Sequence, residues 1–178
     1  MNLTFHPVTK NRWTDFESLF ECRGGPHYCW CMLWRVNENK KSLPGKVGKK
    51  ASMKRRVDEN IPIGLLAYHD DHPIAWCSVA PKDTYRKLGG DTPTDTVWSI
   101  VCFFVKREFR KRGVTSQLLA AAVDFATVSG AQRIEAYPVK TDSPTYRFLG
   151  LVPMFAQAGF KPVTMAGSRR HVMSLDVT

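Results

Sequence analysis

One segment in the second half of the chain constrains the fold most, because an apolar strand, a basic turn and a helix follow one another there. Residues 96–105 are almost continuously apolar, which is typical of a central strand buried on both faces. Five of the seven residues from Lys106 to Arg112 are basic. A helix is then predicted from Gly113 to Gly130, because its apolar residues recur at helical spacing. The segment therefore predicts a mixed α/β fold with this strand at its centre.

The turn between the strand and the helix has the composition of an anion-binding site. The first N–H groups of a helix have no intrahelical acceptor and carry partial positive charge. Arg110, Lys111 and Arg112 add full charges beside them, and Gly113 lets an anion approach the backbone without a side chain in the way. We therefore predict that a phosphate group binds here. The alternative is an ordinary turn with a solvated basic face.

Two other phosphate-binding motifs are excluded. A dinucleotide fingerprint needs three spaced glycines after a strand, and only Gly113 follows this one. Residues 45–50 do not form a Walker loop, because the spacing is wrong and no apolar strand precedes them. In addition, Lys50 stands where Ser or Thr would hold magnesium.

The rest of the chain predicts further strands and helices around this segment. The predicted strands cover residues 2–8, 63–68, 74–80, 133–139, 160–164 and 171–177. The predicted helices cover residues 15–22, about 50–59 and about 152–158. Residues 37–50 are polar and basic and contain Pro44, Gly45 and Gly48, so we expect an exposed loop. With 178 residues and no linker or repeat, we expect one domain over 1–178.

Charge and cysteine content restrict the partners and the compartment. The net charge of +10 fits an acidic ligand or a nucleic acid, but the basic stretch from Lys40 to Arg56 contains no aromatic residue for base stacking. We therefore expect no nucleic-acid partner, with a basic RNA-binding protein as an alternative hypothesis, and leave a homodimer open. The five cysteines are an odd set, and no apolar run approaches about 20 residues. These features predict a cytoplasmic chain with reduced thiols and no membrane contact.

Residues 105–119 (VKREFRKRGVTSQLL) resemble the acetyl-CoA signature of the GNAT superfamily of N-acetyltransferases, which reads Arg/Gln-x-x-Gly-x-Gly/Ala. The resemblance covers about Ile61 to Val177 and implies a single α/β (α+β) domain, in which helices flank a mixed, mostly antiparallel twisted sheet. It also implies that residues 9–60 form a variable region on the acceptor side. Thr115 departs from the signature, since the family prefers Gly or Ala there.

The resemblance further implies a function and a site. The function is transfer of acetyl from acetyl-CoA to an amine of a small molecule or protein by direct attack. The alternative is a CoA-binding module that no longer catalyses. The strand backbone at Phe103, Phe104 and Val105 would pair with the pantetheine arm, with the Phe104 backbone as oxyanion donor. The pyrophosphate would be bound by the turn and the first helical residues, namely Arg110, Lys111, Arg112, Gly113, Val114, Thr115 and Ser116.

The side chains that would move protons depart from the family pattern. Many relatives have a Tyr where this chain has Phe155, and some use a Glu where it has Ser99. Neither replacement is an effective acid or base at neutral pH. Glu135 and Tyr137 are therefore the candidate catalytic side chains, followed by Tyr146, and a chain of water molecules is the alternative.

A cluster of cysteine and aromatic residues lies between residues 22 and 34. Three thiols and an imidazole, from Cys22, His27, Cys29 and Cys31, would suffice for zinc, but the Cys29-x-Cys31 spacing is too tight, so we expect no metal. We expect Cys29, Cys31 and Leu33 to pack inward, and Cys77 and Cys102 to be core residues. Three tryptophans either wall the acceptor site or belong to the core: Trp30, Trp34 and Trp76.

Overall fold

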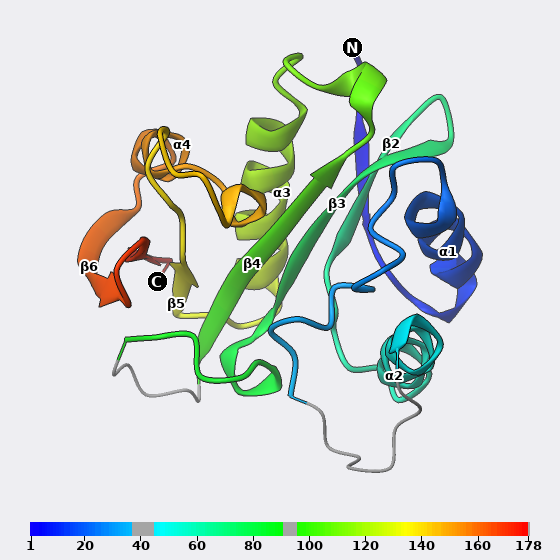
Figure 1. The fold of residues 1–178 in the computed structure, drawn as a ribbon, viewed down its shortest axis with the longest axis horizontal. Helices are drawn as coiled ribbons and strands as arrows, with labels where there is room; N and C mark the ends of the chain where they lie inside the picture. Colours follow the sequence, from blue (N-terminus) through cyan, green and yellow to red (C-terminus); the bar gives the residue numbers. More distant parts are fainter. Residues whose placement is uncertain (37–44, 91–95, 178) are drawn as a thin grey trace.

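A computed structural model describes residues 1–36, 45–90 and 96–177, which form one seven-stranded sheet with helices on both faces (Figure 1). The strand order is β1-β2-β3-β4-β5-β7-β6, and every neighbouring pair is antiparallel except β4 and β5. The strands are β1 (Thr4–Pro7), β2 (Leu65–His69), β3 (His72–Pro81), β4 (Val97–Val105), β5 (Arg133–Ala136), β6 (Lys161–Ala166) and β7 (Arg170–Asp176). The predicted mixed, mostly antiparallel sheet is confirmed.

The four α-helices divide between two apolar clusters that cover opposite parts of the sheet. They are α1 (Trp13–Glu21), α2 (Gly45–Asp58), α3 (Val114–Val128) and α4 (Val152–Gln157). Helices α3 and α4 pack with one set of sheet residues, whereas α1 and α2 pack with another set around Trp30 and Trp76. In α1 the buried residues Trp13, Phe16 and Phe20 recur at helical spacing, so one face of this helix is apolar.

Two sequence predictions about these elements were wrong in part. The predicted loop at 37–50 becomes helical at Gly45, and its residues 37–44 lie outside the described part of the chain. Glycine has low helix propensity, but burial of Met53 and Val57 stabilises α2 against the sheet. The strand predicted to reach Val139 ends at Ala136. Pro138 has no N–H to donate, and Val139 pairs only in an isolated bridge with Leu151.

The sheet opens between β4 and β5. Strand β4 pairs with β5 only from Val97 to Ile100, whereas it pairs with β3 along its length to Val105. In Figure 1 the two strands diverge towards the end of β4. Within the described residues, the second half of β4 therefore has one edge that no β-strand pairs with.

Candidate active site

The backbone of Phe103 and Val105 is directed towards the open edge of β4. In an antiparallel pair, hydrogen-bonded and non-hydrogen-bonded positions alternate. The Lys106 N–H donates to the Ile74 carbonyl at 2.9 Å, so alternation directs Phe104 towards its partner Trp76 on β3. Phe103 and Val105 then face away from β3. In agreement, the Val105 carbonyl accepts a hydrogen bond from Arg110 Nε at 2.9 Å rather than from β3.

The predicted phosphate-binding turn lies directly beyond this edge. Gly113 is the N-cap of α3 with φ of 76°, a left-handed conformation that suits glycine, and no side chain caps this end of the helix. Lys111 has a φ of 60° as well. The turn presents Arg110, Lys111, Arg112, Gly113 and Ser116 to solvent, whereas Thr115 is half-buried and Val114 is buried. The bond from Arg110 to Val105 connects this cationic turn to the open strand edge.

A small apolar cavity of about 150 Å³ lies beside the same part of β4. Residues 101–104 of β4 form one wall, and Cys29, Cys31 and Trp34 from the segment after α1 form another. Phe148, in the short helix η4 (Arg147–Leu149), also lines it. Cys102 and Phe104 pack with the cluster of α1 and α2, so the cavity lies on that face of the sheet. The face covered by α3 is the opposite one.

Cys31 is the thiol of this cavity that titrates nearest to neutrality. A hydrogen bond from the Cys102 thiol is the main cause that lowers the Cys31 pKa to about 7, and the Trp76 indole adds a second bond at 3.3 Å. The buried Arg35 lowers it further, since its hydrogen-bond partners Thr84, Ile63 and Ser78 are all neutral. The same bond to Cys31 raises the Cys102 pKa.

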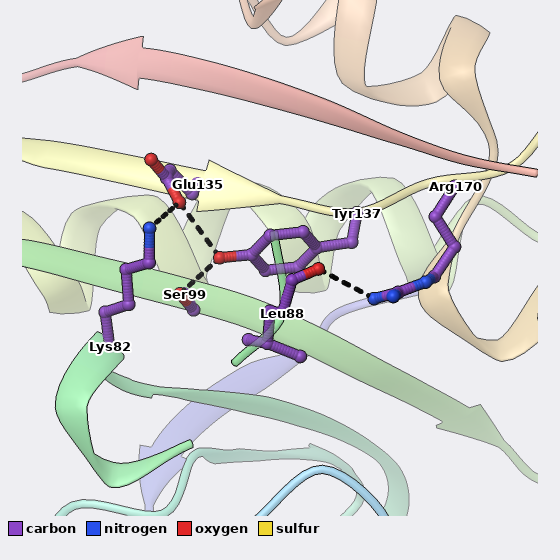
Figure 2. A network of polar contacts seen from close by, with 6 residues as sticks. All are labelled: Lys82, Leu88, Ser99, Glu135, Tyr137 and Arg170. Carbon is purple, nitrogen blue, oxygen red and sulfur yellow. Dashed lines mark hydrogen bonds and ion pairs between the residues drawn. The ribbon is translucent and has the colours of Figure 1, made fainter. Parts of the chain in front are cut away.

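The predicted catalytic pair, Glu135 and Tyr137, belongs to a buried polar network (Figure 2). The Lys82 ammonium lies 2.6 Å from Glu135 Oε2, and the Tyr137 hydroxyl donates to the same oxygen at 3.0 Å. Ser99 is 2.9 Å from the Tyr137 oxygen, and because Tyr137 gives its proton to Glu135, Ser99 is the donor. Burial raises the pKa of Tyr137 well above that of a free phenol. Neither Glu135 nor Tyr137 lines the cavity, although Tyr137 belongs to the same apolar cluster as Val101 of the cavity wall.

The residues that replace the usual proton donors and acceptors are buried as well. Ser99 is engaged with Tyr137, and the ring of Phe155 lies 6.2 Å from that of Phe103 and 5.1 Å from that of Phe160. Tyr146 is 38% exposed, and its ring is 6.2 Å from Trp34, outside the cavity. The structure therefore brings the backbone elements of the site together, but none of the candidate acids and bases lines the cavity.

A match to known proteins identifies the family of this chain. A family model described as "Acetyltransferase (GNAT) family" matches residues 13–150. The chain belongs to the GNAT acetyltransferase family. No curated protein matches the sequence. This membership confirms the predicted family and supports acyl transfer as the general chemistry.

Solved GNAT structures share the fold at low sequence identity. An N-acetyltransferase from Staphylococcus aureus superposes with a TM-score of 0.60 at 10% identity, covering 100% of both chains. An aminoglycoside acetyltransferase in complex with coenzyme A gives 0.62 at 15% identity, covering 98% of this chain and 95% of that one. A putative acetyltransferase from Salmonella typhimurium with acetyl-CoA gives 0.57 at 12% identity, covering 99% and 94%. At these identities the likeness establishes the GNAT fold.

The structure resolves most of the alternatives for the cysteine and tryptophan residues of this GNAT chain. Trp30 and Trp76 are core residues, at 2% and 0% exposure, whereas Trp34 lines the cavity. Leu33 was predicted to pack inward but is 49% exposed. The expected inward packing of alternate residues requires a strand, but Trp30 and Cys31 have positive φ, so the segment forms a turn instead. Cys77 is core as predicted, but Cys102 is only half-buried and lines the cavity.

Several site residues were not found from the sequence. Lys82 and Arg35 are buried cations whose partners are far away in the chain, and Phe148 lies in a short 3-10 helix without a periodic signal. No group of three or more His, Cys, Asp or Glu among the described residues is arranged to hold a metal ion. Within the same residues, no helix is long and apolar enough to cross a membrane.

The low pKa of Cys31 predicts its reactivity. With a pKa of about 7, the thiolate fraction should rise about tenfold between pH 6 and pH 8 and then level off. Alkylation of Cys31 by iodoacetamide, followed by peptide mass spectrometry, should show this profile. Burial raises the Cys29 pKa to about 11, so this neighbouring thiol should react far more slowly at pH 8. A Cys31 rate that still rises about tenfold from pH 8 to pH 9 would contradict the assignment, and Cys31→Ser is the control.

Proposed function

We propose that this chain is an N-acetyltransferase that transfers the acetyl group of acetyl-CoA to an amine of a small molecule or protein by direct attack. The observation that carries the proposal is the continuity of three features in one segment. The open edge of β4 runs into a cationic turn, and the turn leads into the N-terminus of α3, where the N-cap Gly113 has no side chain to bond the first N–H groups. A strand edge suits an extended amide-bearing arm, and a helix N-terminus suits a phosphate.

Each part of the segment has a separate task in this proposal. The backbone groups of Phe103 and Val105 pair with the pantetheine arm, because alternation directs them to the open edge. The N–H groups of residues 111–116, with the side chains of Arg110, Lys111 and Arg112, hold the pyrophosphate. The segment at residues 26–34, within the predicted acceptor-side region 9–60, supplies the amine side of the cavity.

The oxyanion that forms during acyl transfer needs a backbone N–H at the open edge. Phe104 was the predicted donor, but its N–H is directed towards Trp76 of β3. In the proposal this task passes to the N–H of Phe103 or Val105, because both groups are directed to the open edge of β4. The predicted proton carriers Glu135 and Tyr137 do not line the cavity, and the Val101 side chain cannot relay a proton, so these residues would need water molecules to reach the amine.

The test is a coupled assay of the purified chain with acetyl-CoA and a panel of primary amines, following free thiol release and the mass of each acetylated amine. Amine-dependent thiol release with a matching mass increase of one acetyl group supports the proposal. Binding of acetyl-CoA without acetylation of any amine would favour a CoA-binding module.

A basic RNA-binding protein is the other alternative, and the charges of α2 do not favour it. Lys50 is paired with Glu17 and Glu21 at 2.5 and 2.7 Å, and Lys54 is paired with Asp58 at 2.5 Å. Paired cations are less available to phosphates than isolated ones. Salt-sensitive retention of the protein on RNA in the absence of acetyl-CoA would support this alternative.

A further inference from the structure

The lining of the cavity beside β4 restricts the amine that can occupy it. Among the residues that the structure describes, none with a carboxylate, ammonium, guanidinium or imidazole side chain lines this cavity. Its polar groups are three thiols, the Tyr28 phenol and the Trp34 indole. A set of hydroxyl groups would lose hydration there without gaining a strongly polar partner. The lining group that could face a second ammonium with a negative charge is the Cys31 thiolate, but it already accepts hydrogen bonds from Cys102 and Trp76 and is compensated by the buried Arg35. An apolar group would gain about 25 cal/mol for each Å² of surface removed from water.

The size of the cavity indicates which apolar group fits inside it. The cavity volume is about 150 Å³. An apolar cavity of roughly 150 Å³ in another protein takes up benzene, so a single aromatic ring or a short branched chain fits here. The aromatic walls at Phe104, Phe148 and Trp34 offer ring contacts to such a group.

The charges next to the cavity act against a polycation. The Arg170 guanidinium lies 4.5 Å from the ring centre of Trp34, and Lys49 Nζ donates to the Tyr28 carbonyl at 3.1 Å. Both contacts place a positive charge on a residue of the cavity wall. Together with the net charge of +10, they raise the positive potential that an approaching diamine or polyamine would meet.

We infer that the acceptor is a small apolar primary amine, with one ring or a short branched chain and no second cationic group. This inference deepens the proposed function and rests on it. The amine is held by its apolar part between the residue 26–34 segment and β4. Its nitrogen then faces the open strand edge, where the Phe103 and Val105 backbone is directed.

The first test compares phenethylamine with 1,5-diaminopentane and spermidine as acceptors for the wild-type chain. The value of kcat/KM for phenethylamine should exceed the values for both polycations by about tenfold or more, because burying a second ammonium is unfavourable. A higher value for either polycation would overturn the inference. In that case amine acetylation itself would still stand.

The second test changes the charge of the cavity at a site that tolerates substitution. Leu33 lines the cavity and is 49% exposed, so Leu33→Glu adds a carboxylate at its rim, and Leu33→Gln is the uncharged control of equal size. Leu33→Glu should raise the kcat/KM ratio of 1,5-diaminopentane to phenethylamine by about tenfold relative to Leu33→Gln, through attraction of the second ammonium. An equal ratio in the two variants would exclude this cavity as the amine site. The affinity for acetyl-CoA should be the same in both.

A binding measurement separates this inference from the proposed function. Phenethylamine should slow the alkylation of Cys31, which lines the cavity, and spermidine at the same concentration should not. Protection by phenethylamine without turnover of any amine would contradict the proposed function but support the apolar ligand site. Turnover of phenethylamine without protection would support acetylation and overturn the location.

Discussion

Affinity for acetyl-CoA is expected to fall by about 100-fold in Gly113→Asp, but by less than about tenfold in Gly113→Asn. Gly113 caps α3 with a φ of 76°, and a Cβ atom built there meets no atom within 4 Å. Asp and Asn are the non-glycine residues that best tolerate this left-handed conformation, and they have the same size. The two variants therefore differ mainly in one negative charge, placed where the pyrophosphate is proposed to bind.

Titration calorimetry with acetyl-CoA measures this difference directly. A charge about 4–6 Å from a phosphate at a protein surface is worth about 1–4 kcal/mol, and 100-fold corresponds to about 2.7 kcal/mol. The loss in Gly113→Asp should shrink at high salt, because salt screens charges at the surface. Equal affinities for the two variants would place the pyrophosphate away from α3 and would remove the main support for the proposed function. Thermal unfolding of both variants serves as the check that each is folded.

Glu135→Gln is expected to lower the free energy of unfolding by about 3–5 kcal/mol, because it leaves a buried cation without its counter-charge. Glu135 is fully buried, and its partner Lys82 lies 2.6 Å away with a side chain only 10% exposed. Urea denaturation measures the change. The double variant Glu135→Gln, Lys82→Met removes both charges and should regain part of the lost stability.

Glu135→Gln and a further variant, Tyr137→Phe, separate a structural from a catalytic role for the network. Tyr137→Phe removes the hydrogen bond to Glu135 and should lower the free energy of unfolding by about 1–3 kcal/mol. If Glu135 accepts the proton of the amine, kcat of folded Glu135→Gln should fall by about 100-fold or more. A kcat close to that of the wild type, measured at a temperature where the variant remains folded, would restrict Glu135 to a structural role. Unchanged stability would show that the ion pair with Lys82 contributes little.

The elements with strong periodic signals were predicted within a few residues of their observed ends. The predicted bounds of strand β4 and helix α3 agree closely with the observed ones, because a buried strand and an amphipathic helix have sequence patterns that depend only on neighbouring residues. The cationic turn before α3, which we propose to bind phosphate, was recognised for the same reason, since its cations and its glycine are adjacent in sequence. The start of α2 was missed because Gly45 and Gly48 are poor helix formers, and packing against α1 and the sheet is not a local property.

The surroundings of the candidate catalytic residues and of the cavity depend on contacts that the sequence does not display. Glu135 and Tyr137 were predicted as proton carriers from their alternation on a strand, and that role remains a prediction. Their partners Lys82 and Ser99 come from other parts of the chain. The backbone direction of Phe104 depends on its register with Trp76, which is set when β3 and β4 pair.

The fold family, the central strand and the cationic turn that leads into α3 could all be predicted from the sequence, because each follows from residues a few positions apart. The point where β4 separates from β5, the backbone groups that face the opening and the side chains that form the cavity became clear only from the three-dimensional structure. These features depend on strands and loops up to about 120 residues apart, such as Cys29 and Phe148, whose positions are fixed only when the sheet and its two apolar clusters assemble.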